Sequence, residues 1–499
     1  MTLVVAGITE SAYATEPPFH PGEPYPELRL PIPQQTEPNA PFALLRTLFR
    51  DAGYDAERFG GPDWNPLGHL IQPGQTVLLK PNFVLHRNGS GDDLFAVVTH
   101  PSVLRALIDY VFIALEGRGR IVIADAPQMD CTWRLLAEQL HLDAIQAFYR
   151  EHAGFDIEVH DLRPFELIDP DQPAYSTNRR TLPGDPAGSV RINLGRESAF
   201  HGLPSDRFYG ADYNRQETIA HHHGELHEYA ISRTVLEADV FISVPKMKTH
   251  KKVGVTLNLK GLVGINTNKN CLIHYRVGTP REGGDQLPDQ AGVYDSGMIR
   301  GQRRLFDVLL ARQHPASDFI YKTIRALYRV FIKPFRPISE RARTVDAGNW
   351  HGNDSAWRMT ADLARILYFA DRAGKLQPTP QRRMLCVVDG ILAGDHEGPL
   401  APSAKPAGCI VLGENPLAVD LATTRLMGFD VERIKTFSLR AADRDFGVRE
   451  LTQMEVLVRG ERVDPATFFS AEWACPIPPF VPHSGWIGHV ELGTPDRSD

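Results

Sequence analysis

Apolar and polar positions divide the chain into short apolar runs and longer amphipathic stretches. The apolar runs are rich in β-branched residues, which is typical of strands buried on both faces. They cover residues 3–8, 76–79, 120–125, 157–160, 189–194, 240–244, 384–389, 408–412 and 455–458. The amphipathic stretches have helical spacing and suitable terminal residues, and they predict helices over residues 41–52, 101–115, 131–152, 228–238, 355–373 and 416–427.

This alternation of strand and helix predicts an α/β fold built on a largely parallel, doubly wound (Rossmann-like) sheet. We also expect a helical insertion and an extended, Pro-rich segment near the N-terminus, at residues 16–40. The expected units are a strand, Pro-rich segment and helix over 1–70, an α/β core over 71–295, the helical insertion over 296–350, the rest of the core over 351–475, and a loosely ordered tail over 476–499.

Composition excludes several classes of protein. A net charge of −7 argues against a general nucleic-acid binder. The five cysteines are too scattered for an iron–sulfur or zinc site formed by neighbouring residues, and they favour a reducing compartment. Neither a signal peptide nor an apolar run near the ~20 residues of a spanning helix is present, so we expect a cytoplasmic protein without a transmembrane segment. The sequence contains neither GxGxxG nor GxxxxGK[ST], so the usual nucleotide-binding loops are missing.

The most distinctive stretch follows the apolar run 240–244, where Pro245 is expected to end strand pairing. Cations gather directly after it, where open α/β sheets bind ligands. The candidate catalytic residues are Lys246, Lys248, His250 and Lys260, and the candidate ligand-binding residues are Lys80, Asn82, Lys269, His274 and Asp285. Asp285 follows Gly283-Gly284, which suits a loop over a ligand or a plain turn. Lysines held close together have lowered pKa values, and histidine transfers protons near neutral pH.

Carboxylates follow a later predicted strand and form the third group that we expect to converge on the site. The candidates for an acid or a divalent-metal ligand are Asp389, Asp395, Glu397 and Asp420. Each candidate has a structural alternative: Asp389 before Gly390 suits a turn, Asp420 suits the first turn of a helix, and Lys246 suits a snorkelling side chain. The sequence leaves the cofactor and the metal unidentified.

Two further segments have alternative interpretations. The run His221-His222-His223 with His227 suits either a metal site or, as we favour, a loop and helix cap. Residues 319–336 form an amphipathic helix with one basic and one apolar side. We favour a helix whose apolar side packs on its own domain and whose basic side is solvated; the alternative is a helix that lies on an anionic membrane surface.

Several motifs together resemble the domain-of-unknown-function family 362 over roughly residues 70–440. They are PKMKTHKKVGVTLNLKGLVGI at 245–265 with His274 and GGDQ, DGILAGDHEGP at 389–399, ENPLAVDLATTRLMGFD at 414–430, KPN at 80–82 and VTHP at 98–101. Some members of that family occur with ferredoxin-type iron–sulfur modules, so the resemblance allows a separate iron–sulfur protein as partner. This chain lacks the cysteine spacing for a cluster of its own. Many members have Glu and Asn where this chain has Asp395 and Glu397, so that acidic site does not carry over unchanged.

The sequence-based hypothesis is an enzyme, of the isomerase, lyase or oxidoreductase class. It binds an anionic small molecule over the Lys/His cluster, for proton transfer, isomerisation or redox rearrangement. One alternative is a redox or maturation accessory that docks on a separate iron–sulfur partner. The other is a peripheral membrane protein that uses residues 319–336.

Overall fold

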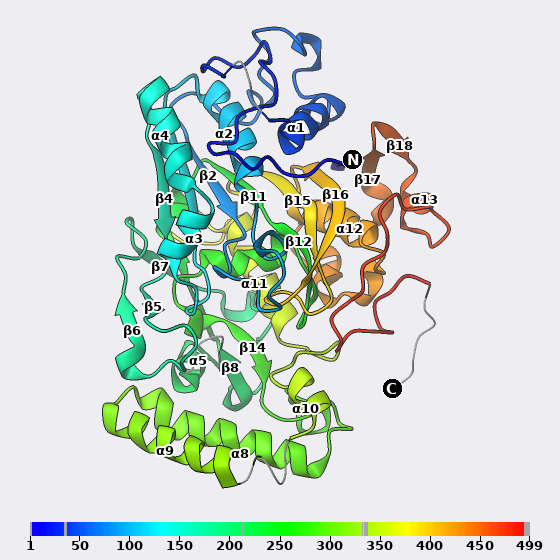
Figure 1. The fold of residues 1–499 in the computed structure, drawn as a ribbon. Coiled ribbons are helices and arrows are strands. Elements are labelled where there is room, and N and C mark those ends of the chain that lie inside the picture. The colour runs from blue at the N-terminus through cyan, green and yellow to red at the C-terminus, as the bar shows by residue number, and fades with distance from the viewer. Residues whose placement is uncertain (1, 34–36, 211–213, 332, 334–337, 494–499) are drawn as a thin grey trace.

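A large mixed sheet forms the centre of the computed structural model, which describes residues 2–33, 37–210, 214–331, 333 and 338–493 (Figure 1). Its strands lie in the spatial order β18 (Glu461–Val463), β17 (Met454–Val458), β1 (Thr2–Ile8), β16 (Ser403–Gly413), β15 (Arg383–Asp395), β11 (Val240–Val244), β2 (Thr76–Pro81), β3 (Arg120–Asp125) and β4 (Ile157–Asp161). Two shorter strands, β12 (Lys246–His250) and β13 (Gly254–Thr256), continue it beyond Pro245.

The strands β15, β11, β2, β3 and β4 are parallel, which confirms the α/β class and a mostly parallel sheet. The antiparallel β15–β16 hairpin was not predicted. We expected a strand to end at Asp389 and a loop to hold Asp395, but β15 runs on to Asp395. A register shift between Gly390 and Leu392 lets the strand bend and keep its pairing with β16, so the Gly residues there mark an irregular strand instead of its end.

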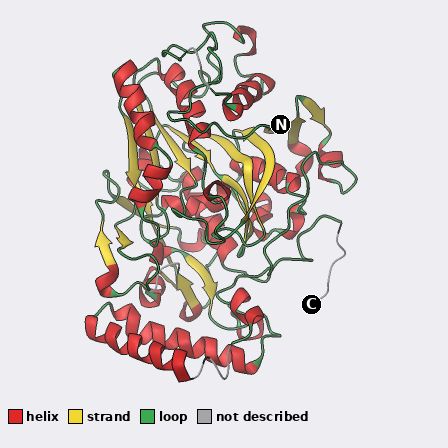
Figure 2. Cartoon of the chain, in the orientation of Figure 1, coloured by secondary structure: helices red, strands yellow, loops and turns green. Residues whose placement is uncertain are grey.

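Each face of the sheet has its own apolar core. Along β2, Val77 and Leu79 belong to one core and Leu78 to the other, because successive side chains of a strand point to opposite faces. The first core includes residues of α1 (Ala40–Asp51), α2 (Pro101–Leu115) and α4 (Leu142–Ala153). The second includes residues of α11 (Ala356–Phe369) and α12 (Pro416–Leu426). Helices therefore cover both faces (Figure 2).

The helix expected over 228–238 is wrong in its first half. Residues 226–232 form β10 (Leu226–Ser232), which pairs with β7 (Ser189–Asn193) and β9 (His222–His223), and only α6 (Arg233–Glu237) is helical. Ser232 is the N-cap of α6, and its hydroxyl accepts a hydrogen bond from the Val235 N–H. Serine is a preferred N-cap residue, so Ser232 was the sequence signal that this helix begins after residue 232.

The segment expected as an insertion forms a helical layer at one end of the molecule (Figure 1). It contains α8 (Val293–Leu309), α9 (Pro315–Phe331) and α10 (Glu340–Val345). The expected helix 319–336 ends within this layer at Phe331, and residues 332 and 334–337 lie outside the described residues. The favoured interpretation of this helix was wrong: its large apolar side chains are exposed, and they do not pack on the protein.

The remaining elements are short. They are α3 (Trp133–Gln139), α5 (Arg215–His221), α7 (Asn258–Gly261), α13 (Pro465–Phe469), β5 (Phe165–Leu167), β6 (Arg179–Thr181), β8 (Phe208–Gly210) and β14 (Ile273–Arg276). Described residues between 9 and 39 lie in neither helix nor strand. The C-terminal segment is not a loose tail over its described part, because Ile477, Phe480 and Trp486 are buried in the core. None of the helices among the described residues is long and apolar enough to cross a bilayer.

Candidate functional site

A cavity of about 380 Å³ opens at the carboxyl ends of the parallel strands. Lys80 of β2 and Asp125, the last residue of β3, line it together with Lys248 and His250 of β12. Along the chain the strands proceed outward from β2 to β4, and β11 then returns to the other side of β2. The cavity thus lies where the direction of strand succession reverses, which is the usual ligand position in open α/β sheets.

Lysines dominate the wall of this cavity. The described lining residues include six lysines and two histidines but only two carboxylates, those of Asp125 and Asp130. The lysines are Lys80, Lys248, Lys251, Lys252, Lys260 and Lys269, and the histidines are His250 and His274. The predicted convergence of the β2 residues with the cationic stretch is therefore present in the structure. Lys251 and Lys252 were not among the candidate site residues, although they belong to the same cationic run.

Four of these lysines are held by the protein itself. Lys252 donates to the Ala347 carbonyl oxygen. Lys80 pairs with Asp125 across 2.9 Å. Lys248 donates to the Asn82 side-chain oxygen at 2.9 Å, and burial and neighbouring lysines lower its pKa well below the ordinary value. Lys269 donates to three backbone carbonyl oxygens at 2.8 to 3.2 Å, which uses every N–H of an ammonium group. These contacts fix the cavity wall and give Asn82 and Lys269 structural roles there.

Lys260 and Lys251 are different, because their side chains make no hydrogen bond or ion pair to any described residue. Burial, with Lys80 and Lys251 nearby, lowers the pKa of Lys260 to about 7. The pKa of Lys251 is also lowered by burial. A lysine that is partly desolvated and lacks a carboxylate partner is ready to bind an anion, because the anion restores the charged form.

The Lys80–Asp125 pair requires a residue without a side chain beside it. Gly264 follows α7, and a Cβ atom there would lie 1.7 Å from the Asp125 Oδ1 and 2.7 Å from the Lys80 Nζ. The Asp125 carboxylate also accepts hydrogen bonds from the Phe83 and Ala126 N–H groups at 2.8 and 2.9 Å. Asp125 was not among the candidate site residues, although its position at the end of an apolar strand was the signal for it.

Backbone hydrogen bonds assign opposite tautomers to the two histidines. The His250 Nδ1 accepts from the Lys252 N–H at 3.0 Å, so in the neutral ring the proton is on Nε2. The His274 Nδ1 lies 2.9 Å from the Leu272 carbonyl oxygen, which only accepts, so Nδ1 carries the proton and Nε2 has a free lone pair. Burial and nearby lysines, Lys260 foremost, hold the pKa of both rings well below 6.5. Both rings are therefore neutral at pH 7.

Lys246 does not line the cavity. Its ammonium group lies 2.6 Å from Asp389, and both side chains are fully buried. The same carboxylate accepts hydrogen bonds from the Tyr13 hydroxyl at 2.5 Å and the His100 N–H at 2.9 Å. This pair ties the N-terminal segment to β12 and β15, behind the cavity wall. Lys246 and Asp389 are thus placed as structural partners of the site.

The other predicted acids also lie outside the cavity. Asp420 accepts hydrogen bonds from the Asn258 and Leu259 N–H groups at 2.9 and 2.8 Å, which holds the first turn of α7, and burial raises its pKa to about 7. Asp395 accepts from the Val481 N–H at 2.7 Å. Glu397 pairs with His483 at 2.8 Å. The predicted acids therefore support the cavity without lining it. Asp420 does so through α7, because the helix turn that it holds contains Lys260.

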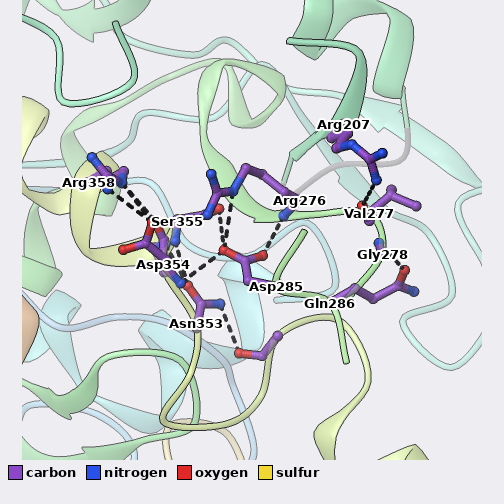
Figure 3. Close-up of polar contacts among 12 residues, drawn as sticks. Arg207, Arg276, Val277, Gly278, Asp285, Gln286, Asn353, Asp354, Ser355 and Arg358 are labelled. Carbon is purple, nitrogen blue, oxygen red and sulfur yellow. Dashed lines mark hydrogen bonds and ion pairs between the residues drawn. The ribbon is translucent and has the colours of Figure 1, made fainter. Parts of the chain in front are cut away.

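Asp285 is placed in a separate polar cluster (Figure 3). It accepts hydrogen bonds from the Arg276 N–H at 2.6 Å, the Asp354 N–H at 2.9 Å and the Ser355 hydroxyl at 2.6 Å. These contacts join the loop after β14 to the start of α11. Asp285 does not line the cavity, and its position next to Gly284 serves this junction.

The histidine run and the predicted acids do not assemble a metal site. Among the described residues, no group of three or more His, Cys, Asp or Glu side chains is arranged to hold a metal ion. His221 pairs with Glu228 at 2.9 Å, and His222 donates its Nε2–H to the Cys271 carbonyl oxygen at 2.8 Å. All five cysteines are unpaired.

A protein-family model described as "Domain of unknown function (DUF362)" matches residues 77–425. No curated protein matches the chain. A crystal structure of a protein from Thermotoga maritima is similar to this chain at 12% sequence identity, with a TM-score of 0.28. That match covers 75% of this chain and 56% of the Thermotoga protein, so the chain spans little more than half of that structure's length.

Proposed function

Because this chain belongs to the DUF362 family, whose description states no activity, we propose a function from the chemistry of the cavity. The protein binds a small molecule with two or more negative charges and catalyses proton transfer at a carbon next to one of its carboxylates. The observation that carries the proposal is the excess of lysines over carboxylates in one cavity of about 380 Å³. We also interpret the sheet as a wound, Rossmann-like one, since β11 returns past β2.

Lys260 and Lys251 are the anion-binding residues in this proposal. Neither has a protein partner among the described residues, and both line the cavity. A carboxylate or phosphate bound there raises their lowered pKa values and gains two charge-assisted hydrogen bonds. Lys80 and Lys248 form the adjoining wall, and their own contacts hold them in place.

The two histidines divide the chemistry. His274 takes the proton from the carbon through the lone pair of Nε2, and His250 donates its Nε2–H to the carboxylate oxygen on which negative charge develops. Return of the proton from His274 to the same carbon, on either face, completes a hydrogen exchange or a racemisation in which no atom is lost and no redox partner is consumed. Neutral rings suit both tasks, because a protonated His274 has no lone pair to offer.

The test is binding and exchange with known anions. Calorimetric titration with succinate, citrate and pyrophosphate should show binding that weakens at least tenfold in Lys260→Met and Lys251→Met, about the loss of one charged hydrogen bond. Lys375→Met, at an exposed position outside the cavity, is the matched control. In D₂O, NMR should show deuterium entering a bound dicarboxylate, and His274→Gln should abolish that exchange.

Equal anion binding by wild type, Lys260→Met and Lys251→Met would refute the anion site. Binding without any deuterium exchange across a broad set of di- and tricarboxylates would leave an anion-binding protein and refute the proton-transfer step. The unpaired cysteines are consistent with the reducing, cytoplasmic location that belongs to this proposal.

A further inference from the structure

Lys260 and Lys269 both line the cavity, but their amino groups have opposite surroundings. Burial lowers the pKa of each to about 7. The Lys269 Nζ donates to three backbone carbonyl oxygens, a set of acceptors that holds the ammonium form and leaves no lone pair on the nitrogen. The Lys260 side chain makes no hydrogen bond or ion pair with a described residue. Of the two, only Lys260 therefore has an amino group that is free to act as a nucleophile.

Lys251 is the other lysine of the cavity without a partner among the described residues, and the charges around it differ from those around Lys260. Burial lowers the pKa of Lys251, but the carboxylates of Glu397 and Asp130 oppose that effect and favour its ammonium form. Burial also lowers the pKa of Lys260, and there the neighbouring charges of Lys80 and Lys251 lower it further. The cavity thus holds one unpartnered lysine whose neighbours favour the charged form and one whose neighbours favour the neutral amine.

The backbone that carries Lys260 is held firmly, although its amino group is not. Asp420 accepts hydrogen bonds from the Asn258 N–H at 2.9 Å and from the Asn258 side-chain amide at 2.7 Å, which fixes the start of α7. After burial, Lys260 is the group that lowers the pKa of both His250 and His274 most, so its amino group lies near both rings. A nucleophile in this position has two proton-transferring groups beside it.

We propose that the neutral amine of Lys260 forms a Schiff base with an oxo-dicarboxylate. The proposal rests on the function proposed above, because it takes the same cavity as the binding site of a dianion. The Lys260 nitrogen forms a bond to the carbonyl carbon of the ligand, and the carbon–oxygen bond breaks. The oxygen leaves as water with two protons, one from the Lys260 amine and one from the Lys251 ammonium group. The product is an iminium that keeps one N–H, and no redox partner is consumed.

The iminium gives a neutral histidine a carbon acid that it is able to deprotonate. A carboxylate alone stabilises a neighbouring carbanion poorly, because it is already negatively charged. Next to an iminium, the electron pair of the broken C–H bond forms a C=C bond, the π pair of C=N moves to nitrogen, and the proton goes to the His274 Nε2. The substrate class is therefore a dicarboxylate with a CH or CH₂ group between its carbonyl carbon and one of its carboxylates.

The experiment is reductive trapping of the full chain with oxaloacetate and sodium cyanoborohydride, followed by mass spectrometry of a protease digest. Hydride converts the iminium into a stable secondary amine and so marks the lysine that formed it. We expect at least about ten times more adduct at Lys260 than at Lys269 or at the exposed Lys375. Saturating succinate should suppress the adduct at Lys260, because both anions occupy the cavity. This comparison is made within the wild-type protein and depends on no variant.

Lys260→Arg is the matched variant, because arginine keeps the positive charge but is not a nucleophile. It should form no adduct in the cavity, yet bind succinate more tightly than Lys260→Met, and thermal unfolding checks that both variants are folded. Succinate binding by wild type without an adduct at Lys260 would overturn the Schiff base and leave the anion site in place. Absence of both would refute both proposals. Equal labelling of Lys260, Lys269 and Lys375, or an adduct that succinate does not suppress, would also overturn the Schiff base.

Discussion

Gly264→Ala is the substitution that tests most directly how the cavity wall is built. The added Cβ would lie 1.7 Å from the Asp125 Oδ1 and 2.7 Å from the Lys80 Nζ, distances that real side chains do not adopt. The backbone of Gly264 is not in the left-handed region, so alanine causes no backbone strain there and its only effect is the steric clash of the added Cβ. The Asp125 carboxylate must therefore move by more than about 1 Å, and it loses its contact with Lys80 or its backbone donors.

The size of the effect follows from what the displacement breaks. The side chains of Lys80 and Asp125 are 2% and 4% exposed, so separating them leaves two buried charges without partners. Breaking a buried ion pair costs about 3–5 kcal/mol. We expect the free energy of unfolding of Gly264→Ala to fall by about that amount, measured by urea denaturation followed by tryptophan fluorescence. Succinate binding in the cavity should weaken in parallel.

Gly261→Ala is the control, because Gly261 also lines the cavity and a Cβ there meets nothing within 4 Å. Alanine inside a helix is favoured over glycine by about 1 kcal/mol, so this variant should be as stable as wild type or slightly more so. If the free energies of unfolding of Gly264→Ala and Gly261→Ala differed by less than about 0.5 kcal/mol, the close approach of Gly264 to the Lys80–Asp125 pair would be refuted.

Three more predictions concern charge and protonation. Succinate affinity should fall as the pH rises above about 7, because the pKa of Lys260 is about 7 in the free cavity and the neutral amine must gain a proton when the anion binds. Calorimetry in buffers of different ionisation enthalpy measures that proton uptake. Succinate binding without proton uptake at alkaline pH would contradict the prediction. Lys246→Met should lower the free energy of unfolding by about 3–5 kcal/mol, because it leaves the buried Asp389 carboxylate without its cationic partner. In thermal unfolding, Lys246→Met/Asp389→Leu should regain much of that loss. A double variant as unstable as the single one would argue against the ion pair. His274→Gln should slow deuterium exchange at least about 100-fold while succinate affinity changes little; an equal loss of both would make His274 a binding residue only.

How far the site was predictable depended on where each residue lies relative to a strand end. Lys80, Lys248 and His250 were found from sequence because each follows or ends an apolar run, and the carboxyl ends of parallel strands meet at one edge. Asp389 satisfied the same rule and yet lies behind the cavity. Its strand does not end there: it bends and pairs with β16, so the carboxylate faces Lys246 instead. A strand end cannot be told from a bulge by apolar pattern alone.

The sequence by itself determined the parallel core, the cationic stretch after residue 244 and the amphipathic character of α9, because these depend on the order of neighbouring side chains. Only the tertiary structure decided which of the cations lack partners, which tautomer each histidine adopts and which side of α9 faces solvent. Those properties depend on groups far apart in sequence, such as Asp125 beside Gly264 or Ser176 beside Asp318. Burial and pairing are set by three-dimensional neighbours, which a linear pattern does not specify.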